Sequence, residues 1–229
     1  ASHDLQEPLR KIQSFNSLIL EHENHCLTDS AKHYFGRSMA AAERMRELIK
    51  DLIDYSRTNA ANWEFESVDL NDLLREVKED LSELISEKAA IINASHLPTV
   101  SVIKFMFRQL FQNLISNSLK YQQPDLSPVV MVIYQRVEPD FISSKASDEM
   151  HQLSFSDNGI GFDQSYSKRI FQLFQRLHGR SEYSGTGIGL AICHRIMQNH
   201  NGTITAEGSL NNGATFIMKW PVTQAHSLN

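Results

Sequence analysis

Apolar residues recur at helical spacing over the first 57 residues of the chain. Over residues 4–22, the apolar stripe consists of Leu5, Leu9, Ile12 and Ile19, with Phe15 and Leu18 beside it. The stretch "LTDSAKHYF" then predicts a new helix that begins with Thr28 or Asp29 as its N-cap and ends near Arg57. Its apolar positions repeat by threes, fours and sevens, as in a heptad seam, at Phe35, Ala42, Met45, Ile49 and Leu52.

Residues 1–62 are therefore predicted to form a helical hairpin. Two helices joined by a short loop pack antiparallel, but one pair cannot bury both apolar stripes completely. A homodimer that forms a four-helix bundle would bury them. The alternative is a hairpin that packs against the domain that follows.

Residues 63–229 are predicted to form a second domain of mixed elements. The segment "TNAANWEFESVDLND" interrupts the helical pattern and is interpreted as a linker, after which Asp69 or Asn71 can cap the helix "LLREVKEDLSELISEK". The other predicted helices span 104–121, 166–174 and 187–199. The predicted strands span 91–94, 99–103, 129–137, 151–157, 203–208 and 214–220, and the Asn-Gly of "SLNNGA" suits a hairpin turn between the last two. Because these elements do not alternate as βαβ units, the predicted fold class is α+β, a helical hairpin followed by an α/β two-layer sandwich.

Composition narrows the function classes. The chain has 229 residues, of which 41% are hydrophobic and 21% charged, as in soluble globular proteins. Its net charge of −5 does not favour binding to nucleic acid or to an anionic membrane. No apolar run approaches the ~20 residues that span a bilayer. Cys26 and Cys193 are far apart and are interpreted as free thiols in a reducing compartment, which predicts a cytoplasmic segment. Without an initiator Met or a signal peptide, the chain is expected to be part of a longer protein.

A histidine opens the first predicted helix. His3 is followed by Asp4, and Glu7 lies one helical turn later. His3 is about 200° around the helix from Leu5, so it lies off the apolar stripe and faces solvent. An exposed histidine beside acids can serve as a nucleophile, but it can equally be an ordinary surface residue.

The stretch "QNLISNSLKY" places four polar or aromatic residues on one face of the 104–121 helix. These are Asn113, Asn117, Lys120 and Tyr121. Amide oxygens suit Mg²⁺ that bridges phosphates, an ammonium group attracts phosphate, and an aromatic ring can stack on a base. A solvated polar face without function is the alternative.

The stretch "SFSDNGIGF" places Asp157 at the end of a predicted strand, before Gly159 and Gly161. A carboxylate there can accept a hydrogen bond from an exocyclic amine such as adenine N6, and the glycines let backbone approach a flat ligand. A plain Asp-Asn-Gly turn is the alternative.

The stretch "SGTGIGLAI" opens a predicted helix with Gly185, Gly187 and Gly189. Backbone N–H groups at a helix N-terminus favour phosphate. The stretch is neither a dinucleotide fingerprint, since no strand directly precedes it, nor a P-loop, since no Lys-Ser/Thr follows.

These stretches, together with "SHDLQEPL" and "IFQLFQRLHG", resemble in their order the H, N, G1, F and G2 boxes of sensor histidine kinases. Within that family the chain is most similar to the phytochrome-like and hybrid-kinase group. The resemblance implies a dimerisation and histidine-phosphotransfer hairpin at 1–62 and a GHKL-type ATP-binding domain at 63–229. It further implies a homodimer, a response-regulator partner, and an upstream sensor domain in a protein that is soluble or membrane-anchored upstream.

The resemblance also implies the catalytic roles. His3 would accept the phosphoryl group from ATP, Asp4 would draw off the imidazole proton, and Arg176 would reach the γ-phosphate. Asn113 stands where ATPases of the superfamily keep a catalytic glutamate, which favours transfer to histidine over hydrolysis. A GHKL-type ATPase and a non-catalytic nucleotide-binding scaffold are the alternatives. Glu7 stands where relatives with phosphatase activity carry Thr or Asn, which argues against that activity here.

The nucleotide-binding roles follow in the same way. Asn117 would hold Mg²⁺, Lys120 would meet phosphate and Tyr121 would flank adenine. Asp157 would bind adenine N6, with Gly161 and Thr215 completing that pocket. The remaining residues implied to contact the nucleotide are Asn113, Gly159, Gly185, Thr186, Gly187, Gly189 and Leu190.

Overall fold

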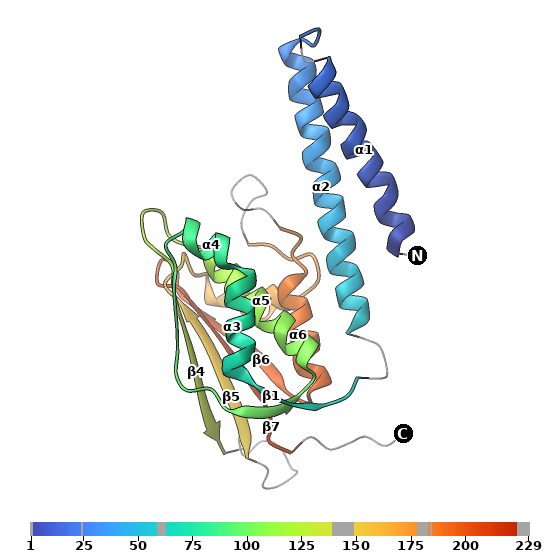
Figure 1. Cartoon of the computed structure of the whole chain (residues 1–229). Coiled ribbons are helices and arrows are strands. Elements are labelled where there is room, and N and C mark those ends of the chain that lie inside the picture. The colour runs from blue at the N-terminus through green and yellow to red at the C-terminus, as the bar shows by residue number, and fades with distance from the viewer. Residues whose placement is uncertain are drawn as a thin grey trace.

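The computed structural model of the chain describes residues 2–23, 25–58, 63–138, 149–177, 183 and 185–223, with side chains from residue 6 onward. A long helical hairpin projects from an α/β part (Figure 1). In the described ranges, no helix is both long enough and apolar enough to cross a membrane.

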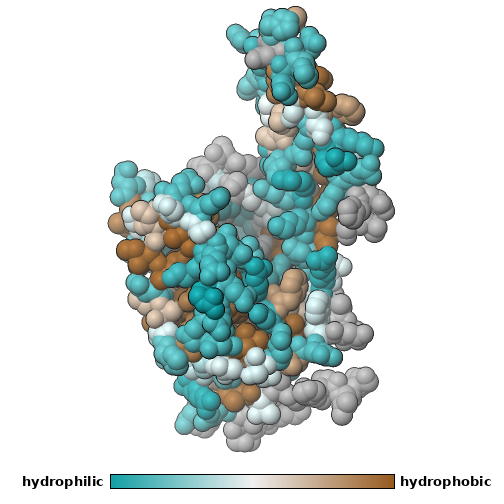
Figure 2. All heavy atoms as spheres, viewed as in Figure 1, coloured by the Kyte–Doolittle hydropathy of each residue, from teal (hydrophilic) through white to brown (hydrophobic). Residues whose placement is uncertain are grey.

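The hairpin consists of α1 (Ser2–His22) and α2 (Asp29–Arg57), which pack against each other as predicted (Figure 1). Thr28 is the N-cap of α2, and its hydroxyl accepts a hydrogen bond from the backbone N–H of Ala31. Leu9 and Ala42 are buried in the contact. Other apolar positions remain 43–63% exposed, namely Ile12, Phe15, Leu18, Met45 and Leu52. Figure 2 accordingly shows hydrophobic side chains on the surface of the hairpin. The pair alone therefore leaves part of both apolar stripes in water.

The predicted linker contains a strand that sequence reasoning missed. β1 (Glu66–Asp69) pairs antiparallel with β3 (Thr99–Val102). Only Val68 of β1 is buried, so this short strand carries no alternating pattern of its own. Asp69 caps α3 (Leu70–Asp80), as predicted, by accepting from the N–H of Asn71 at 2.7 Å. The helix then breaks at Leu81, so the single predicted helix over 73–88 is in fact α3 and α4 (Ser82–Glu87).

The remaining strands form a five-stranded sheet in the described part of the chain, in the order β2-β4-β5-β7-β6. β2 and β4 are parallel, and the other neighbours are antiparallel. The strands are β2 (Ile91–Ala94), β4 (Val129–Val137), β5 (Met150–Asp157), β6 (Thr203–Gly208) and β7 (Ala214–Pro221). All the predicted strands are present within a residue or two of their expected bounds.

Helices α3, α5 (Lys104–Lys120) and α6 (Gly189–Asn199) form the second layer of the α/β part (Figure 1). Phe107 and Phe111 of α5 are fully buried against the sheet. Phe107 makes an edge-to-face contact with Trp220, with 5.2 Å between ring centroids, and Phe111 makes one with Phe155 at 5.0 Å. This two-layer core confirms the predicted α+β class and fixes α5 across the sheet.

The predicted helix over 166–174 is wrong. The segment contains two short 3-10 turns, η1 (Gln164–Tyr166) and η2 (Arg169–Phe171). Ile170 is buried, but Phe174 is 59% exposed and has a positive φ of 62°. The apolar residues here therefore do not form one continuous helical face, and the backbone turns away at Phe174.

Three contacts hold the α/β part against the end of α2. The side-chain amide of Asn199 donates to the carbonyl of Thr58 at 2.6 Å. Thr186 donates its hydroxyl to the carboxylate of Asp51. The indole nitrogen of Trp63, whose ring stacks on Phe105 with 5.6 Å between centroids, donates to the carbonyl of Arg57 at 3.1 Å. The last turns of α2 and the residues after it thus contact both the glycine segment before α6 and the last residue of α6.

Candidate functional site

A cavity of about 830 Å³ opens between α2, α5 and the glycine segment that precedes α6. Its volume lies within the range of small-molecule and cofactor sites. The α5 wall contains the four residues that the sequence placed on one helix face, Asn113, Asn117, Lys120 and Tyr121. The structure thus brings these residues together around one space.

Lys120 is the cation of this wall. Its ammonium lies 4.6 Å from the centre of the Tyr121 ring. A Cβ built on Gly185 would lie 2.5 Å from that ammonium, so glycine at 185 leaves the room that Lys120 occupies. Asn113 lies deeper, and its amide donates to the carbonyl of Gly189 at 3.3 Å. The wall therefore joins a positive charge and amide groups to the start of α6.

The glycine segment forms the opposite wall, which includes Gly185, Thr186, Gly187, Gly189 and Leu190. Gly185 and Gly187 have φ of 131° and 75°, values that residues with a Cβ rarely adopt. No side chain caps the first turn of α6, within the part of the chain that the structure describes. The backbone N–H groups of that turn are therefore suited to an anion.

Asp157 lies at the end of β5, at a second cavity of about 100 Å³ that shares Asn117, Tyr121 and Leu190 with the first. One carboxylate oxygen accepts from the N–H groups of Gly159 at 2.9 Å and Ala214 at 3.2 Å. The other lies 3.1 Å from the hydroxyl of Ser118. Burial raises the pKa of Asp157 above its ordinary value, and these hydrogen bonds oppose the rise.

The small cavity combines this carboxylate with mostly apolar walls, to which Phe162, Ile170, Leu177 and Phe216 contribute. A flat heteroaromatic ring with an amine would gain apolar contact on its faces and a charge-assisted hydrogen bond at its edge. The two cavities together therefore suit a ligand with an aromatic base at one end and anionic groups at the other.

The glycines after Asp157 lie against protein backbone. A Cβ on Gly159 would lie 2.4 Å from the carbonyl oxygen of Tyr121, and one on Gly161 would lie 2.0 Å from that of Ser209. These glycines therefore permit close packing of protein backbone at this end of β5. Gly161 still lines the small cavity, whereas Gly159 lines neither cavity. Thr215 also lines neither, and its hydroxyl pairs with that of Ser156 at 2.9 Å.

Arg176 lines the small cavity and holds the chain before α6. Its guanidinium donates to the carbonyl of Gly185 at 2.9 Å and to that of Tyr183. Its Nε is buried without a hydrogen-bond partner among the described residues. Arg176 thus ties the small cavity to the backbone of the glycine segment that lines the large one.

The first predicted site residues lie at the start of α1. The backbone of His3 and Asp4 is helical, and their side chains fall outside the described part of the chain. Glu7, one turn later, is exposed and forms an ion pair with Lys11 at 2.9 Å.

Sequence reasoning missed three residues that shape the site. Asp51 of α2 lines the large cavity, and burial raises its pKa. Ser118 contacts Asp157, as described above. The amide nitrogen of Gln123 lies 2.8–3.1 Å from the carbonyl oxygens of Asn158, Gly159 and Asn211 and joins the loop after β5 to the β6–β7 turn. Ser118 directly follows Asn117 in the sequence, and this position next to a predicted site residue is the signal that could have identified it. The sequence around Asp51 and Gln123 contains no comparable signal.

Comparisons with known proteins agree with this architecture. Residues 104–224 match the family model described as "Histidine kinase-, DNA gyrase B-, and HSP90-like ATPase", and residues 1–61 match "His Kinase A (phospho-acceptor) domain". Cyanobacterial phytochrome A of Nostoc sp. (strain PCC 7120) is 36% identical over 97% of this chain and 28% of its own length. Phytochrome-like protein Cph1 of Synechocystis sp. (strain PCC 6803) is 33% identical over the same shares. The chain therefore spans little more than a quarter of these relatives.

Solved structures are similar over almost the whole chain. Full-length ShkA in complex with AMPPNP matches with a TM-score of 0.69 and 25% identity, over 98% of this chain and 45% of ShkA. Histidine kinase ThkA in complex with the response regulator protein TrrA matches with a TM-score of 0.63 and 21% identity, over 97% of this chain and 60% of ThkA. The latter similarity concerns the fold.

Proposed function

The chain belongs to the sensor histidine kinases, and from that premise we propose that it transfers the γ-phosphoryl group of ATP to His3 and then to an aspartate of a response regulator. The chain spans little more than a quarter of the length of its phytochrome relatives, and an upstream sensor domain is part of this proposal. Its activity would be that of an ATP-dependent protein histidine kinase in two-component signalling.

The pair of connected cavities is the observation that carries this proposal. The small cavity would hold adenine, with its exocyclic amine donating to Asp157 and Tyr121 beside the ring. The triphosphate would extend into the large cavity, between the ammonium of Lys120 and the first turn of α6. Thr186, Gly187 and Gly189 would contact phosphate there, and the guanidinium of Arg176, which donates to the carbonyl of Gly185 on that wall, would reach phosphate by a change of rotamer.

Mg²⁺ fits the junction of the cavities. Asn117 lines both cavities, and its amide oxygen is the ligand that would hold the ion. When bound, the ion would neutralise phosphate charge. The residues of the chain would position the nucleotide, exclude water and bring the γ-phosphorus to the imidazole nitrogen of His3, with Asp4 holding the imidazole proton.

Hydrolysis by a GHKL-type ATPase is the rival reaction. Asn113 occupies the α5 position implied for the catalytic carboxylate, and an amide cannot take a proton from water. The carboxylate of Asp51 lines the cavity, but it is already accepting from Thr186. These residues favour transfer to a histidine over attack by water.

A homodimer would complete the hairpin. The exposed apolar positions Ile12, Phe15 and Leu18 of α1 and Met45 and Leu52 of α2 would be buried in a four-helix bundle. A second copy of the chain is therefore the proposed partner of this surface, in addition to the response regulator.

Incubation with γ-labelled ATP and Mg²⁺ separates kinase, ATPase and scaffold. A kinase acquires label that is acid-labile and alkali-stable, as expected for phosphohistidine. Labelled inorganic phosphate without labelled protein would indicate an ATPase, and binding without either product would indicate a scaffold. Asn117→Asp should reduce Mg²⁺-dependent binding and labelling more than metal-free binding. Asn93→Asp, at an exposed position of β2, is the matched control and should change neither.

A further inference from the structure

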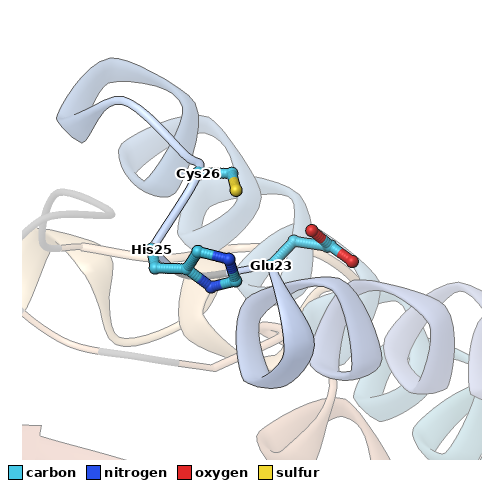
Figure 3. A group of neighbouring side chains, drawn as sticks. All are labelled: Glu23, His25 and Cys26. Atoms are coloured by element: carbon cyan, nitrogen blue, oxygen red, sulfur yellow. The ribbon is translucent and has the colours of Figure 1, made fainter.

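Three different metal-ligating side chains gather at the tip of the hairpin, at the end away from the α/β part (Figure 1). They are Glu23, His25 and Cys26, from the loop between α1 and α2 (Figure 3). One ligand atom of each, a carboxylate oxygen, an imidazole nitrogen and the thiol sulfur, lies within 4.8 Å of the other two. All three residues are exposed.

A backbone turn holds this group together. The N–H of Cys26 donates to the carbonyl of Glu23 at 2.9 Å, and the N–H of Glu23 donates to the carbonyl of Ile19 at 2.9 Å. The first bond closes the turn that contains His25, and the second fixes Glu23 to the last turn of α1. The spacing of the three side chains is therefore set by hydrogen-bonded backbone at both ends.

We propose that this tip binds Zn²⁺ or a similar borderline divalent transition metal. Thiolate, imidazole and carboxylate together match Zn²⁺, whereas Mg²⁺ and Ca²⁺ prefer oxygen ligands alone. Zn²⁺ bonds of about 2.0–2.3 Å place tetrahedral ligands roughly 3.5 Å apart. Exposed side chains reach that separation by rotation, because they break no packing contacts.

Three protein ligands leave the fourth tetrahedral position to water or to an exchangeable ligand. Binding replaces the thiol proton of Cys26 with the metal, so affinity rises with pH. The bound ion ties the end of α1 to the loop that enters α2 and shields the thiol from electrophiles. This site does not depend on the proposed kinase function, because it shares no residue with the cavities.

Co²⁺ is the spectroscopic probe. Titration of the whole chain, with a phosphine as reductant, should give one bound ion per chain, d–d bands of tetrahedral intensity and a near-ultraviolet thiolate-to-cobalt band, all displaced by Zn²⁺. Cys26→Ser should remove the thiolate band. His25→Gln and Glu23→Gln should each weaken binding at least about tenfold, the lower end of the cost of losing even an outer-shell partner.

Two variants serve as matched controls. Cys193→Ala removes the buried thiol, and His33→Gln removes an exposed histidine on α2, so both should keep the complete spectrum. In the wild-type chain, Zn²⁺ should slow alkylation of Cys26 by a maleimide. The proposal is overturned if the thiolate band is absent, if it survives in Cys26→Ser, or if Zn²⁺ leaves the alkylation rate of Cys26 unchanged.

Discussion

The substitution Asp157→Asn should separate nucleotide binding from folding. The Asn side-chain oxygen can still accept from the N–H groups of Gly159 and Ala214, which now donate at 2.9 and 3.2 Å. The new amide group would face the Ser118 hydroxyl, which can accept from it and donate to the carbonyl of Leu114, 3.2 Å away. We therefore expect the variant to fold.

Asp157→Asn should instead weaken the binding of the nucleotide. The wild-type carboxylate offers only acceptors to the adenine amine, whereas the variant presents N–H groups where an acceptor is needed. A hydrogen bond to a charged group contributes about 1.5–3 kcal/mol, so the Kd of ATP and that of ADP should both rise roughly tenfold to a hundredfold. Calorimetry of both nucleotides measures this. Asp163→Asn is the matched control, because that exposed carboxylate accepts from Ser165 outside both cavities.

Although Asp157→Asn should weaken nucleotide binding, it should stabilise the nucleotide-free protein at neutral pH. Because burial raises the pKa of Asp157, the folded protein binds a proton there more tightly than the unfolded chain. Its contribution is therefore most favourable at low pH and falls as pH rises from the ordinary carboxyl pKa through the raised value. At neutral pH, Asp157→Asn should have a higher free energy of unfolding than the wild type, with a smaller gain in acid. An unchanged Kd together with a destabilised fold would refute the assignment of Asp157 as a nucleotide ligand.

Three further predictions concern other parts of the molecule. The ring of buried His200 bonds to the carbonyl of Ile196 at 2.7 Å and accepts from the N–H of Ile103 at 3.0 Å, and burial lowers its pKa to about 4. His200→Leu should therefore cost about 1–3 kcal/mol in urea unfolding at pH 7, because the N–H of Ile103 loses its acceptor, whereas the carbonyl of Ile196 still accepts from the backbone N–H of residue 200. Because the pKa of His200 is lowered in the folded protein, the wild type loses stability as the pH falls from 6.5 to 4. His200→Leu should lose less stability over this range. Met45→Glu should give monomers by light scattering, unlike the control Arg44→Gln; a wild-type monomer at micromolar concentration would contradict the bundle. Glu7→Asn should raise the dephosphorylation rate of a phosphorylated response regulator with little effect on folding, because the Glu7–Lys11 pair is exposed; wild-type phosphatase activity abolished by this change would contradict our interpretation of Glu7.

The sequence predicted those helices and strands that are determined by residues close together in the chain. The cap at Thr28 and the apolar periods of α1, α2 and α5 depend on residues a few positions apart. β1 depends instead on pairing with β3, 30 to 36 residues later, and its single buried Val68 gives no pattern. The predicted helix at 166–174 failed because Ile170 is buried by the fold while Phe174 is not.

The residues of the candidate site likewise include some that helical spacing predicted and others that it could not predict. Helical spacing placed Asn113, Asn117, Lys120 and Tyr121 on one wall, and the structure places them there. The contact of Ser118 with Asp157 joins residues 39 positions apart, and that of Thr186 with Asp51 joins residues 135 positions apart. No spacing rule reaches such pairs, because the packing of α5 on the sheet and of α2 beside α6 creates them.

Transfer of phosphate to His3 is the central claim, and labelling of matched variants tests it most directly. The wild-type chain and His3→Gln should bind ATP with the same Kd, because His3 is the proposed phosphoryl acceptor and is not among the residues proposed to hold the nucleotide. With γ-labelled ATP and Mg²⁺, the wild type should acquire acid-labile label on the peptide that contains His3, and His3→Gln should acquire none. Replacement of His22, at the other end of α1, should leave the labelling unchanged. Label that persists in His3→Gln, or that maps to another peptide, would contradict the account.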